Sequence, residues 1–550
     1  MGLSYRVLDL SHFSRDYYKK FIDSVRRTKK IKRAIRGKIR DRRGSILAMT
    51  TVKIDIGVDP QMADRQEDQQ KIIQLAELLG QNPREIAEFF KRESFISKGE
   101  KRPLRWKKIA TLDDSDLYGK IQQLRIRGVY GVEHGERIYP HRELASHVIG
   151  FVNREWVAVC GVERFLDDFL RGSDGLIESE KDGKREEVAL FRKVVIEPKN
   201  GANVNLTIDL QVQEIAERAL QRAVAELNPK SGSVIVSDPN SGEILALCNA
   251  PTFDCNAYGK AETGALRNRA IADMYEPGSV FKIVPFSVAL QSGLITPDRS
   301  FDCSRETFQW GGRTYPLPRD HKNFLHLSAV DILRQSSNRG VAQIGIMLGA
   351  ERLYWAARRF GFGERTGYDF DGEAAGLLQK PEFWDGLTIT RLPMGHAICA
   401  TPLQVHLAMG VVASGGYLLR PRVISGVVDE NGEAIFEMES AIVRRVLEPH
   451  IAKKLAEILH NPESPLSVVE RVKLAYKTGT TQKLVGGAYS RERHIASCSG
   501  FFPLGEPKFL VTVVLDEPVM STGTAYGVRA AYPVLAEIAR ALTLLRGLDH

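Results

Sequence analysis

The sequence predicts an α+β fold in which helices cover a central antiparallel sheet. Strand-like runs occur at residues 205–248 and again at 472–515, and a helix-rich stretch separates the two groups. The first group contains two runs joined by a short Pro/Asn/Gly turn, which is typical of a β-hairpin. An amphipathic helix is predicted to close the chain over residues 528–545. Because strands from both groups must pair across the helical middle, we expect one sheet with helices packed on it.

The N-terminal part has a different pattern. Residues 66–91 predict two short amphipathic helices, because their apolar residues recur near a period of 3.6. A turn-rich boundary follows at residues 199–201, and a strand and a long helix over 210–227 come directly after it. The sequence therefore predicts a mixed α/β domain before residue 201 and a separate, larger domain after it.

The positive charge of the chain lies at its N-terminus. The 550 residues contain 43% hydrophobic and 26% charged residues, as a globular protein of two or three domains does. Residues 1–43 hold fifteen Lys or Arg and four Asp, a net +11, so the other 507 residues carry −2. This distribution does not favour nucleic acid as a partner. It leaves two alternatives open for the segment, an anionic membrane surface and a solvated tail.

The sequence shows neither an apolar segment for export or membrane insertion nor a cysteine motif for redox chemistry. No apolar run reaches the roughly 18 residues of a membrane span, and no apolar core follows the basic start as in a secretory signal. The six cysteines are scattered without a C-x-x-C pair, so neither zinc nor thioredoxin-type chemistry is indicated. Cys248 and Cys255 are close enough in sequence to pair in an oxidising compartment, but unpaired buried thiols are the simpler interpretation. No metal or organic cofactor is predicted.

The first candidate catalytic motif is Ser279-Val-Phe-Lys282, which follows a Pro-Gly turn. A helix beginning near Ser279 would place its hydroxyl and the Lys282 amine on one face. A serine becomes a nucleophile when a neighbouring base accepts its proton, and a lysine can do so when burial and nearby cations lower its pKa. By itself the motif is also compatible with a helix-capping serine and an exposed lysine.

The second motif is Ser336-Ser337-Asn338, after a predicted helix over residues 329–335. Here Ser336 can relay a proton and Asn338 can hold a substrate amide. Ser and Asn are also common at helix ends, so this motif alone is weak evidence.

The third motif is Lys477-Thr478-Gly479-Thr480, at the end of an apolar strand. Lys477 and Thr478 offer a cation and a hydroxyl for a substrate carboxylate. Gly479 has no side chain, so we expect an extended ligand to lie against the strand there. An ordinary turn that ends a strand is the alternative interpretation.

Together the motifs form the S-x-x-K, S-x-N and K-T-G set, each once and in the order found in penicillin-binding proteins and serine β-lactamases. Residues 268–279 resemble the acylation segment of class B penicillin-binding proteins, the division-type transpeptidases especially. The resemblance covers roughly residues 36–535 and is carried also by segments at 36–48, 137–150, 161–163, 233–246, 401–404 and 477–483.

The resemblance implies a basic juxtamembrane-like segment at 1–35, a pedestal (dimerisation-type) domain at 36–200 and a penicillin-binding transpeptidase domain at 201–550. In this reading Ser279 attacks the penultimate D-Ala carbonyl of a stem peptide, and Lys282 is the general base.

The resemblance also implies roles for the other motif residues. Ser336 would relay a proton to the leaving amine, and Asn338 would hold a substrate amide. Lys477 and Thr478 would bind the carboxylate, and the N–H groups of Ser279 and Thr480 would form the oxyanion hole.

The implied activity is D,D-transpeptidation of peptidoglycan in septal cell-wall synthesis, with D-Ala-D-Ala stem peptides as substrate and β-lactams as covalent inhibitors. A membrane glycosyltransferase and other division proteins are the implied partners, and nucleic acid is not one. A hydrolase (D,D-carboxypeptidase or β-lactamase), a β-lactam sensor and a non-catalytic division scaffold are the alternatives.

Two departures from the family pattern accompany the resemblance. Gly395-His396-Ala397 replaces a pattern that usually has a second glycine, so the packing of the cleft is expected to differ there. The family's membrane helix should precede Arg36 and is absent from the sequence. The implied location is the outer face of the cytoplasmic membrane, and we expect the anchor to be encoded upstream of Met1.

Overall fold

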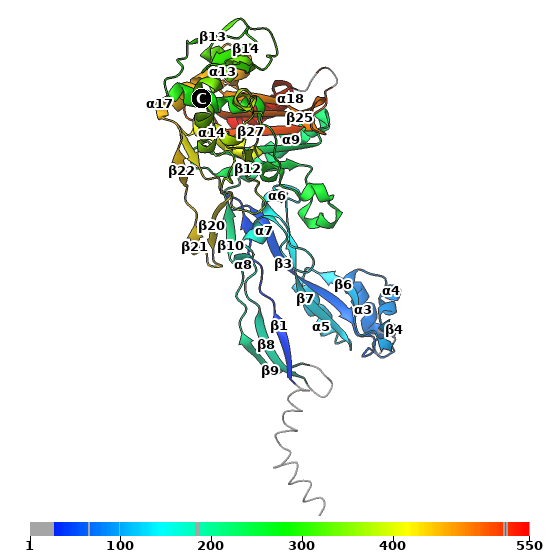
Figure 1. Ribbon diagram of the computed structural model, residues 1–550. Coiled ribbons are helices and arrows are strands. Elements are labelled where there is room, and N and C mark those ends of the chain that lie inside the picture. Colours follow the sequence, from blue (N-terminus) through cyan, green and yellow to red (C-terminus); the bar gives the residue numbers. More distant parts are fainter. Residues whose placement is uncertain are drawn as a thin grey trace, which may run out of the picture. The chain divides into compact units, whose positions relative to one another are not determined.

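The computed structural model describes residues 27–63, 66–97, 100–181, 187–520, 523 and 526–548 (Figure 1). Of the predicted basic segment at 1–35, residues 1–26 lie outside this part. The chain divides into two compact units whose segments alternate along the sequence. Within the described residues, the smaller unit consists of residues 27–38, Ala48–Ile138 and Asp168–Ala202, and the larger unit of Ile39–Leu47, Tyr139–Asp167 and Asn203 onward. The predicted domains are contiguous instead, and their boundaries stay a prediction.

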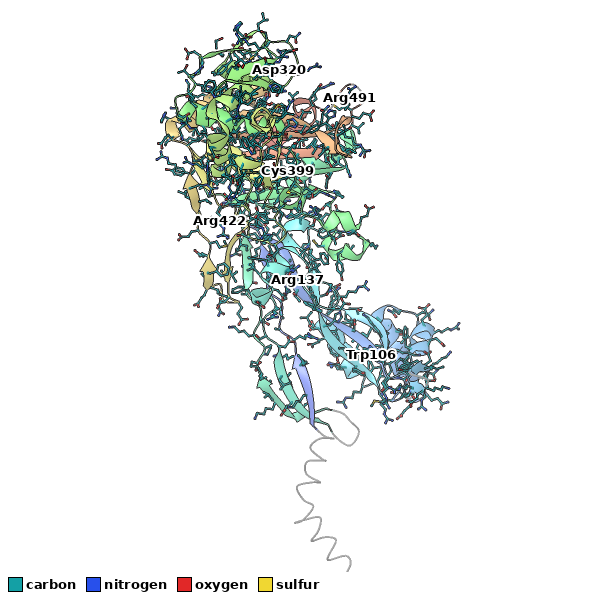
Figure 2. All side chains as sticks on the ribbon, viewed as in Figure 1. Trp106, Arg137, Asp320, Cys399, Arg422 and Arg491 are labelled. Carbon is teal, nitrogen blue, oxygen red and sulfur yellow. The ribbon has the colours of Figure 1, made fainter. Side chains whose placement is uncertain are left out.

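The smaller unit contains two antiparallel sheets of three strands each and the antiparallel pair β4–β5. In one, β8 lies between β1 and β9; in the other, β3 lies between β6 and β7. A buried cluster beneath the second sheet includes Ile56 and Leu75, and the buried Arg137, labelled in Figure 2, donates to the Gly37 carbonyl oxygen at 2.7 Å. The elements are β1 (Arg27–Lys32), β3 (Ile46–Val58), α3 (Gln69–Leu79), α4 (Pro83–Phe89), β4 (Ser94–Ser97), β5 (Glu100–Pro103), β6 (Lys107–Leu112), α5 (Ser115–Gln123), β7 (Val129–Ile138), α8 (Asp167–Leu170), β8 (Gly175–Lys181) and β9 (Glu187–Ile196).

The two helices predicted within residues 66–91 are confirmed as α3 and α4. Gly80 ends α3 in the left-handed conformation, with φ of +64°, which glycine adopts without strain. Asn82 then caps α4 by accepting a hydrogen bond from the Arg84 backbone N–H at 2.9 Å, and Pro83 occupies the first helical position. Local cap chemistry therefore determines where both helices begin and end.

A five-stranded antiparallel sheet forms the centre of the larger unit, as the sequence predicts. Its order is β12-β11-β27-β26-β25, so strands from both groups pair through β11 and β27, and β25 lies at the edge. The strands are β11 (Ser231–Ser237), β12 (Ile244–Ala250), β25 (Ala475–Val485), β26 (Ala488–Phe502) and β27 (Phe509–Asp516).

Helices cover both faces of this sheet (Figure 1). On one face α9 (Leu210–Leu227) and α18 (Gly527–Arg546) pack on alternate strand residues such as Val234 and Val513. On the other face α11 (Ile283–Gln291), α16 (Pro402–Ala413) and α17 (Pro449–Leu459) enclose residues that include Phe501. The predicted α+β class is confirmed. Within the part of the chain described, none of the helices combines the length and the apolar content needed to cross a bilayer.

Smaller elements surround this centre. One further group of strands is built around β10. This strand pairs with β2 in parallel and with β20 in antiparallel orientation, and β20 pairs with β21 in antiparallel orientation. The remaining elements of the larger unit are β2 (Ile39–Arg40), α6 (Ser146–Ile149), α7 (Gly161–Phe165), β10 (Asn203–Leu206), α10 (Arg269–Ala272), β13 (Ser300–Asp302), β14 (Thr307–Trp310), β15 (Arg313–Pro316), β16 (His326–Ser328), α12 (Ala329–Arg334), α13 (Asn338–Leu348), α14 (Ala350–Arg359), β17 (Leu377–Leu378), α15 (Thr388–Arg391), β18 (Ile398–Cys399), β19 (Tyr417–Leu419), β20 (Ile424–Val428), β21 (Ala434–Glu437), β22 (Ile442–Arg445), β23 (Val468–Val469) and β24 (Val472–Lys473), with short 3-10 turns between them.

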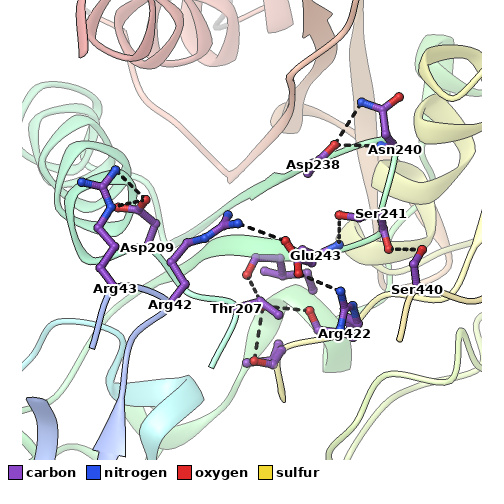
Figure 3. A network of polar contacts seen from close by, with 12 residues as sticks. Arg42, Arg43, Thr207, Asp209, Asp238, Asn240, Ser241, Glu243, Arg422 and Ser440 are labelled. Atoms are coloured by element: carbon purple, nitrogen blue, oxygen red, sulfur yellow. Dashed lines mark hydrogen bonds and ion pairs between the residues drawn. The ribbon is translucent and has the colours of Figure 1, made fainter. Parts of the chain in front are cut away.

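Two carboxylates join the early segment Ile39–Leu47 to the body of the larger unit (Figure 3). Asp209, whose side chain is fully buried, pairs with Arg43 at 3.2 Å and with Arg546 at 2.6 Å. Glu243 pairs with Arg42 at 3.3 Å and with Arg422 at 2.7 Å. Because a buried carboxylate without a cation costs several kcal/mol, about 3–5 when one partner is removed, these pairs make residues 42 and 43 an integral part of the unit.

Candidate active site

The three predicted motifs converge beside the edge strand β25, within the larger unit. Ser279 and Lys282 lie on the 3-10 turn η4 (Gly278–Lys282), which continues directly into α11. Ser336 lies between α12 and α13, and Lys477 lies on β25. Hydrogen bonds connect the second and third motifs to Lys282, so residues up to 195 positions apart in the sequence share one site.

Hydrophobic packing fixes the turn that carries Ser279. Val280 and Phe281 are each 1% exposed, and burying one such side chain is worth about 1.5–3 kcal/mol. The Phe281 ring also packs edge-on against Phe362, with ring centroids 5.1 Å apart. Residues i and i+3 eclipse in a 3-10 turn, so Lys282 lies directly below the half-buried Ser279. A 3-10 turn takes the place of the first α-helical turn expected here, and the predicted proximity of the Ser279 hydroxyl and the Lys282 amine stays a prediction.

Gly278 is required where the turn meets β25. Its φ is +57°, and a Cβ at this position would lie 2.4 Å from Thr481 Oγ1. Real Cβ atoms do not approach so closely, so the strand packs against the backbone of the turn. The Pro-Gly dipeptide thus allows η4 to pack closely against β25 and also reverses the direction of the chain.

Lys282 and Lys477 converge on one hydroxyl. Lys282 Nζ lies 3.2 Å from Ser336 Oγ, 2.6 Å from the Ser336 carbonyl oxygen and 2.7 Å from Asn338 Oδ1. Lys477 Nζ lies 3.1 Å from the same Ser336 Oγ and 3.0 Å from the Thr478 carbonyl oxygen. The two lysine side chains are 0% and 6% exposed, respectively, so both amines are buried among oxygen atoms.

Backbone strain aims the Ser336 hydroxyl. Ser336 has a φ of +57°, in the left-handed region that serine rarely adopts. Such a conformation persists only where the surrounding structure holds it. Here Ser337 caps α13 by accepting from the Gly340 N–H at 3.0 Å, and Asn338 begins that helix. The strained residue is therefore held between two helices, and its side chain lies between the two lysines.

Asp320 anchors the same loop and is a residue that the sequence motifs do not indicate (labelled in Figure 2). Its carboxylate accepts hydrogen bonds from Ser337 Oγ at 2.8 Å, from the Arg339 N–H at 3.2 Å and from the Asn338 N–H. A carboxylate at the start of a helix also meets the positive end of the helix dipole. Asp320 thereby orients Asn338, although it lies 18 positions earlier in the chain.

Burial and charge lower the pKa of both lysines. The pKa of Lys282 falls well below its usual value because the amine is buried and because the Lys477 charge lies nearby, while Asp320 acts in the opposite direction. Burial lowers the pKa of Lys477 to about 8. Lys282, whose pKa falls well below its usual value, can therefore be neutral and accept a proton, while Lys477, with a pKa of about 8, is mostly charged at neutral pH.

The contacts of Lys282 fit a neutral amine. A neutral amine has two N–H groups and one lone pair, and the two short contacts, to the Ser336 carbonyl and to Asn338 Oδ1, can only accept N–H groups. The third contact is a hydroxyl, which can donate to the lone pair while it accepts from Lys477. Lys477, Ser336 and Lys282 thus form a chain along which a proton can move.

The strand alternation separates the residues of the K-T-G-T motif. Lys477 and Gly479 share the face of β25 that packs on η4, whereas Thr478 and Thr480 share the other face. Thr480 Oγ1 accepts from the Gly527 N–H at 2.8 Å, at the start of α18. Because β25 is the edge strand, its outer backbone groups face away from the sheet, where an extended ligand can pair with them.

The structure gives a different reason for Gly479 from the one predicted. A Cβ at this position would lie 2.5 Å from Ser497 Oγ, 2.9 Å from the Pro277 carbonyl oxygen and 3.0 Å from Val280 Cγ2. The missing side chain therefore makes room for the segment around η4, and the expectation that an extended ligand lies against the strand at Gly479 stays a prediction.

Neither metal ligands nor a disulfide accompany this site in the described residues. No group of three His, Cys, Asp or Glu side chains there is arranged to hold a metal ion. All six cysteines are free thiols, and Cys248 and Cys255, the pair considered from the sequence, are both buried.

Comparison with known proteins decides the family. The model of the penicillin binding protein transpeptidase domain matches residues 232–540, more than half of the chain, and that of the penicillin-binding protein dimerisation domain matches residues 31–206. The chain belongs to the penicillin-binding protein family. The predicted resemblance to class B transpeptidases is confirmed.

Relatives in this family match most of the chain. Stage V sporulation protein D of Bacillus subtilis (strain 168) is 28% identical over 512 residues, which cover 92% of this chain and 77% of that protein. Peptidoglycan D,D-transpeptidase FtsI of Escherichia coli (strain K12) is 29% identical over 427 residues, which cover 77% and 69%. The crystal structure of a peptidoglycan synthetase from Bifidobacterium adolescentis ATCC 15703 superposes with a TM-score of 0.72 at 27% identity, over 94% of this chain and 97% of that one.

Proposed function

We propose that this penicillin-binding protein is a peptidoglycan D,D-transpeptidase that crosslinks stem peptides through an acyl-enzyme on Ser279. One observation carries the proposal: Lys282 and Lys477 contact the same Ser336 hydroxyl beside the turn that bears Ser279. Lys282 can be neutral because its pKa is lowered, whereas Lys477 is charged at neutral pH. Such an arrangement supplies a base for the nucleophile, an acid for the leaving group and a cation for a carboxylate.

In the acylation step, Ser279 Oγ attacks the carbonyl carbon of the penultimate D-Ala, and Lys282 accepts the serine proton. The oxyanion is held by the backbone N–H groups of Ser279 and Thr480. As the C–N bond breaks, the proton passes from Lys282 through Ser336 to the amine of the departing D-Ala. Lys477 and Thr478 bind the terminal carboxylate, and Asn338 holds a backbone amide of the stem peptide.

In the second step, the amine of another stem peptide attacks the ester carbonyl, and Ser279 recovers its proton. A β-lactam undergoes only the first step. Attack of Ser279 opens the β-lactam ring and forms an ester of the same kind, but the amine that is released stays attached to the acyl group and does not leave the site. The acceptor decides between transfer and hydrolysis, and we assign the amine as acceptor because the chain also matches the dimerisation domain of penicillin-binding proteins.

Septal synthesis is the process we assign to the enzyme, on the likeness of residues 268–279 to division-type enzymes and on the relative named FtsI. We further propose that the catalytic unit acts on the outer face of the cytoplasmic membrane, where peptidoglycan lies, with a membrane glycosyltransferase and division proteins as partners. Depletion of the protein is then expected to give filamentous cells. Rounded cells would instead indicate a role in elongation.

Covalent labelling tests the chemistry. Fluorescent penicillin is expected to label the wild-type protein, mass spectrometry should locate the adduct on Ser279, and Ser279→Ala should abolish the label without lowering the melting temperature. A donor stem peptide with an excess of an amine acceptor then separates transfer from hydrolysis. An adduct on another serine, or release of D-Ala with no transfer product, would refute the corresponding part of the proposal.

A further inference from the structure

The carboxylate of Glu276, three residues before Ser279, connects three segments of the larger unit. Its Oε1 accepts hydrogen bonds from the Ala397 N–H at 3.0 Å and from the Tyr489 hydroxyl at 3.0 Å. Its Oε2 lies 2.8 Å from His396 Nδ1, and since a carboxylate only accepts, that ring nitrogen carries the hydrogen. The three donors come from the turn after α15 and from the start of β26.

The backbone of the same segment is held as well. The Glu276 carbonyl oxygen accepts from Thr481 Oγ1 at 2.9 Å, which ties it to β25. The Gly278 N–H donates to the Gly395 carbonyl oxygen at 3.1 Å, which ties it to the turn that contains Ala397. The backbone therefore ties the residues before Ser279 to β25 and to the turn at 395–397, and the side chain ties them to the same turn and to β26.

The Glu276 carboxylate binds the backbone of Ala397, a residue in an unfavourable conformation. This residue has a φ of +59°, and a Cβ makes that conformation unfavourable. Its N–H is the one that Glu276 accepts. The carboxylate thus holds a strained turn whose neighbour, Gly395, bonds to the nucleophile-bearing segment.

The cluster is largely shielded from water. The Glu276 and His396 side chains are 19% and 18% exposed, and the His396 ring packs edge-on against Tyr489 with centroids 5.6 Å apart. Against the effect of burial, the hydrogen bond and charge of His396 hold the pKa of Glu276 below its usual range. Burial and the Glu276 charge raise the pKa of Tyr489 to about 12, with Arg391 and Cys399 as the other titratable groups acting on that hydroxyl. The carboxylate is therefore ionised and the phenol protonated at neutral pH.

We propose that Glu276 is a positioning residue for acylation, whose carboxylate ties the segment 276–279 to the turn at 395–397 and to the start of β26. It touches no group that reacts. It acts through Ser279, whose hydroxyl and backbone N–H must keep a fixed place relative to Thr480 on β25. This inference rests on the proposed function of Ser279.

The test measures penicillin acylation under conditions that separate the rate constant of the chemical step from the affinity of the first complex. Glu276→Ala removes all three acceptor contacts and is expected to lower the chemical rate constant about 10- to 100-fold, as misplacement of reacting groups by about 1 Å does, with little change in affinity. Glu276→Gln keeps oxygen and nitrogen atoms at the same places and should retain an intermediate rate. Tyr489→Phe, which removes one donor, should have a smaller effect that is not additive with Glu276→Ala.

Glu364→Ala is the matched control. Glu364 is a half-buried carboxylate that pairs with Arg358 at 2.8 Å and with Arg444, so its loss costs stability without touching the segment 276–279. If Glu276→Ala fails to fold, Glu276→Gln and Tyr489→Phe carry the test. A chemical rate constant within about two-fold of wild type in Glu276→Ala, or an equal loss in Glu364→Ala at the same melting temperature, would overturn the inference. A wild-type protein that penicillin does not acylate would instead refute the proposed function.

Discussion

Lys282 Nζ and Lys477 Nζ lie 3.2 Å and 3.1 Å from Ser336 Oγ, so the hydroxyl lies between two buried amines. Both amines contact this hydroxyl, and burial together with the Lys477 charge lowers the pKa of Lys282. Proton transfer in this site is therefore a property of three residues from three separate parts of the chain.

Replacing Lys282 by arginine tests its role as a base. Lys282→Arg keeps a positive charge, but guanidinium has a pKa above about 12 and does not deprotonate usefully. We expect acylation by penicillin to fall by at least about 100-fold, the scale of general-base catalysis. Stopped-flow measurement with a fluorescent penicillin gives the rate, and the melting temperature is the control for folding. Near-normal acylation by this variant would remove Lys282 from the role of base.

The dependence of acylation on pH should be bell-shaped. The reaction requires Lys282 neutral and Lys477 charged, so the rate rises as Lys282 loses its proton and falls as Lys477 does, about pH 8. The lowered pKa of Lys282 places the rising limb well below the 10.5 of an ordinary lysine. Rates from about pH 5 to about pH 10 would define both limbs.

Lys477→Arg identifies the falling limb of that profile. Arginine stays charged throughout this range, so the limb near pH 8 should move to higher pH even if the maximal rate is lower. An unchanged falling limb in the variant would assign it to another group.

Removal of Asp320 should loosen the loop of the second motif. Asp320→Ala leaves the Asn338 and Arg339 N–H groups and the Ser337 hydroxyl without this acceptor, which costs about 1–3 kcal/mol of unfolding free energy. Because Asn338 contacts Lys282, we also expect slower acylation. Denaturant unfolding and acylation rates measure the two effects.

Asp254→Ala is the matched control for Asp320→Ala. Asp254 likewise accepts a backbone N–H, that of Asn256 at 2.8 Å, and pairs with Arg142 at 2.8 Å. It should lose stability at an unchanged acylation rate. A similar loss of rate in both variants would show that Asp320 has no specific role in the site.

Addition of one methyl group at Gly479 should displace η4 from β25. The Cβ of Gly479→Ala would meet the Pro277 carbonyl oxygen at 2.9 Å, and backbone cannot rotate away as a side chain can. Overpacking of this kind costs about 1–3 kcal/mol, and we expect acylation to fall because Ser279 lies two residues beyond Pro277. Gly505→Ala, where a Cβ would meet nothing within 4 Å, should leave both stability and acylation unchanged. Normal acylation by Gly479→Ala would show that this contact does not position Ser279.

Local signals in the sequence predicted much of this structure. The capping residues Gly80 and Asn82 determine the ends of α3 and α4, and the unique S-x-x-K, S-x-N and K-T-G motifs predicted a shared site for Ser279, Ser336 and Lys477. Each of these signals lies within a few residues, where periodicity, caps and motif spacing act.

Contacts between distant segments could not be predicted in this way. Glu276 meets Tyr489 213 positions later, and Asp320 meets a loop 17 positions later, and neither pair leaves a local pattern. Gly479 shows the same limit, because a glycine in a strand indicates close approach without identifying the neighbour. Glu276 could have been noticed as part of the Glu-Pro-Gly-Ser sequence before the nucleophile, but its partners could not.

The shared pairing of Asp209 with Arg43 and Arg546 has a consequence for biosynthesis. The ribosome delivers Arg43 first, Asp209 166 residues later and Arg546 another 337 residues after that. The buried carboxylate therefore gains its second cation only after Arg546 has left the exit tunnel. A protein cut short near residue 540 would keep every catalytic motif and still leave this buried charge with one of its two cations, so the fold of the larger unit depends on residues that follow all of the catalytic motifs.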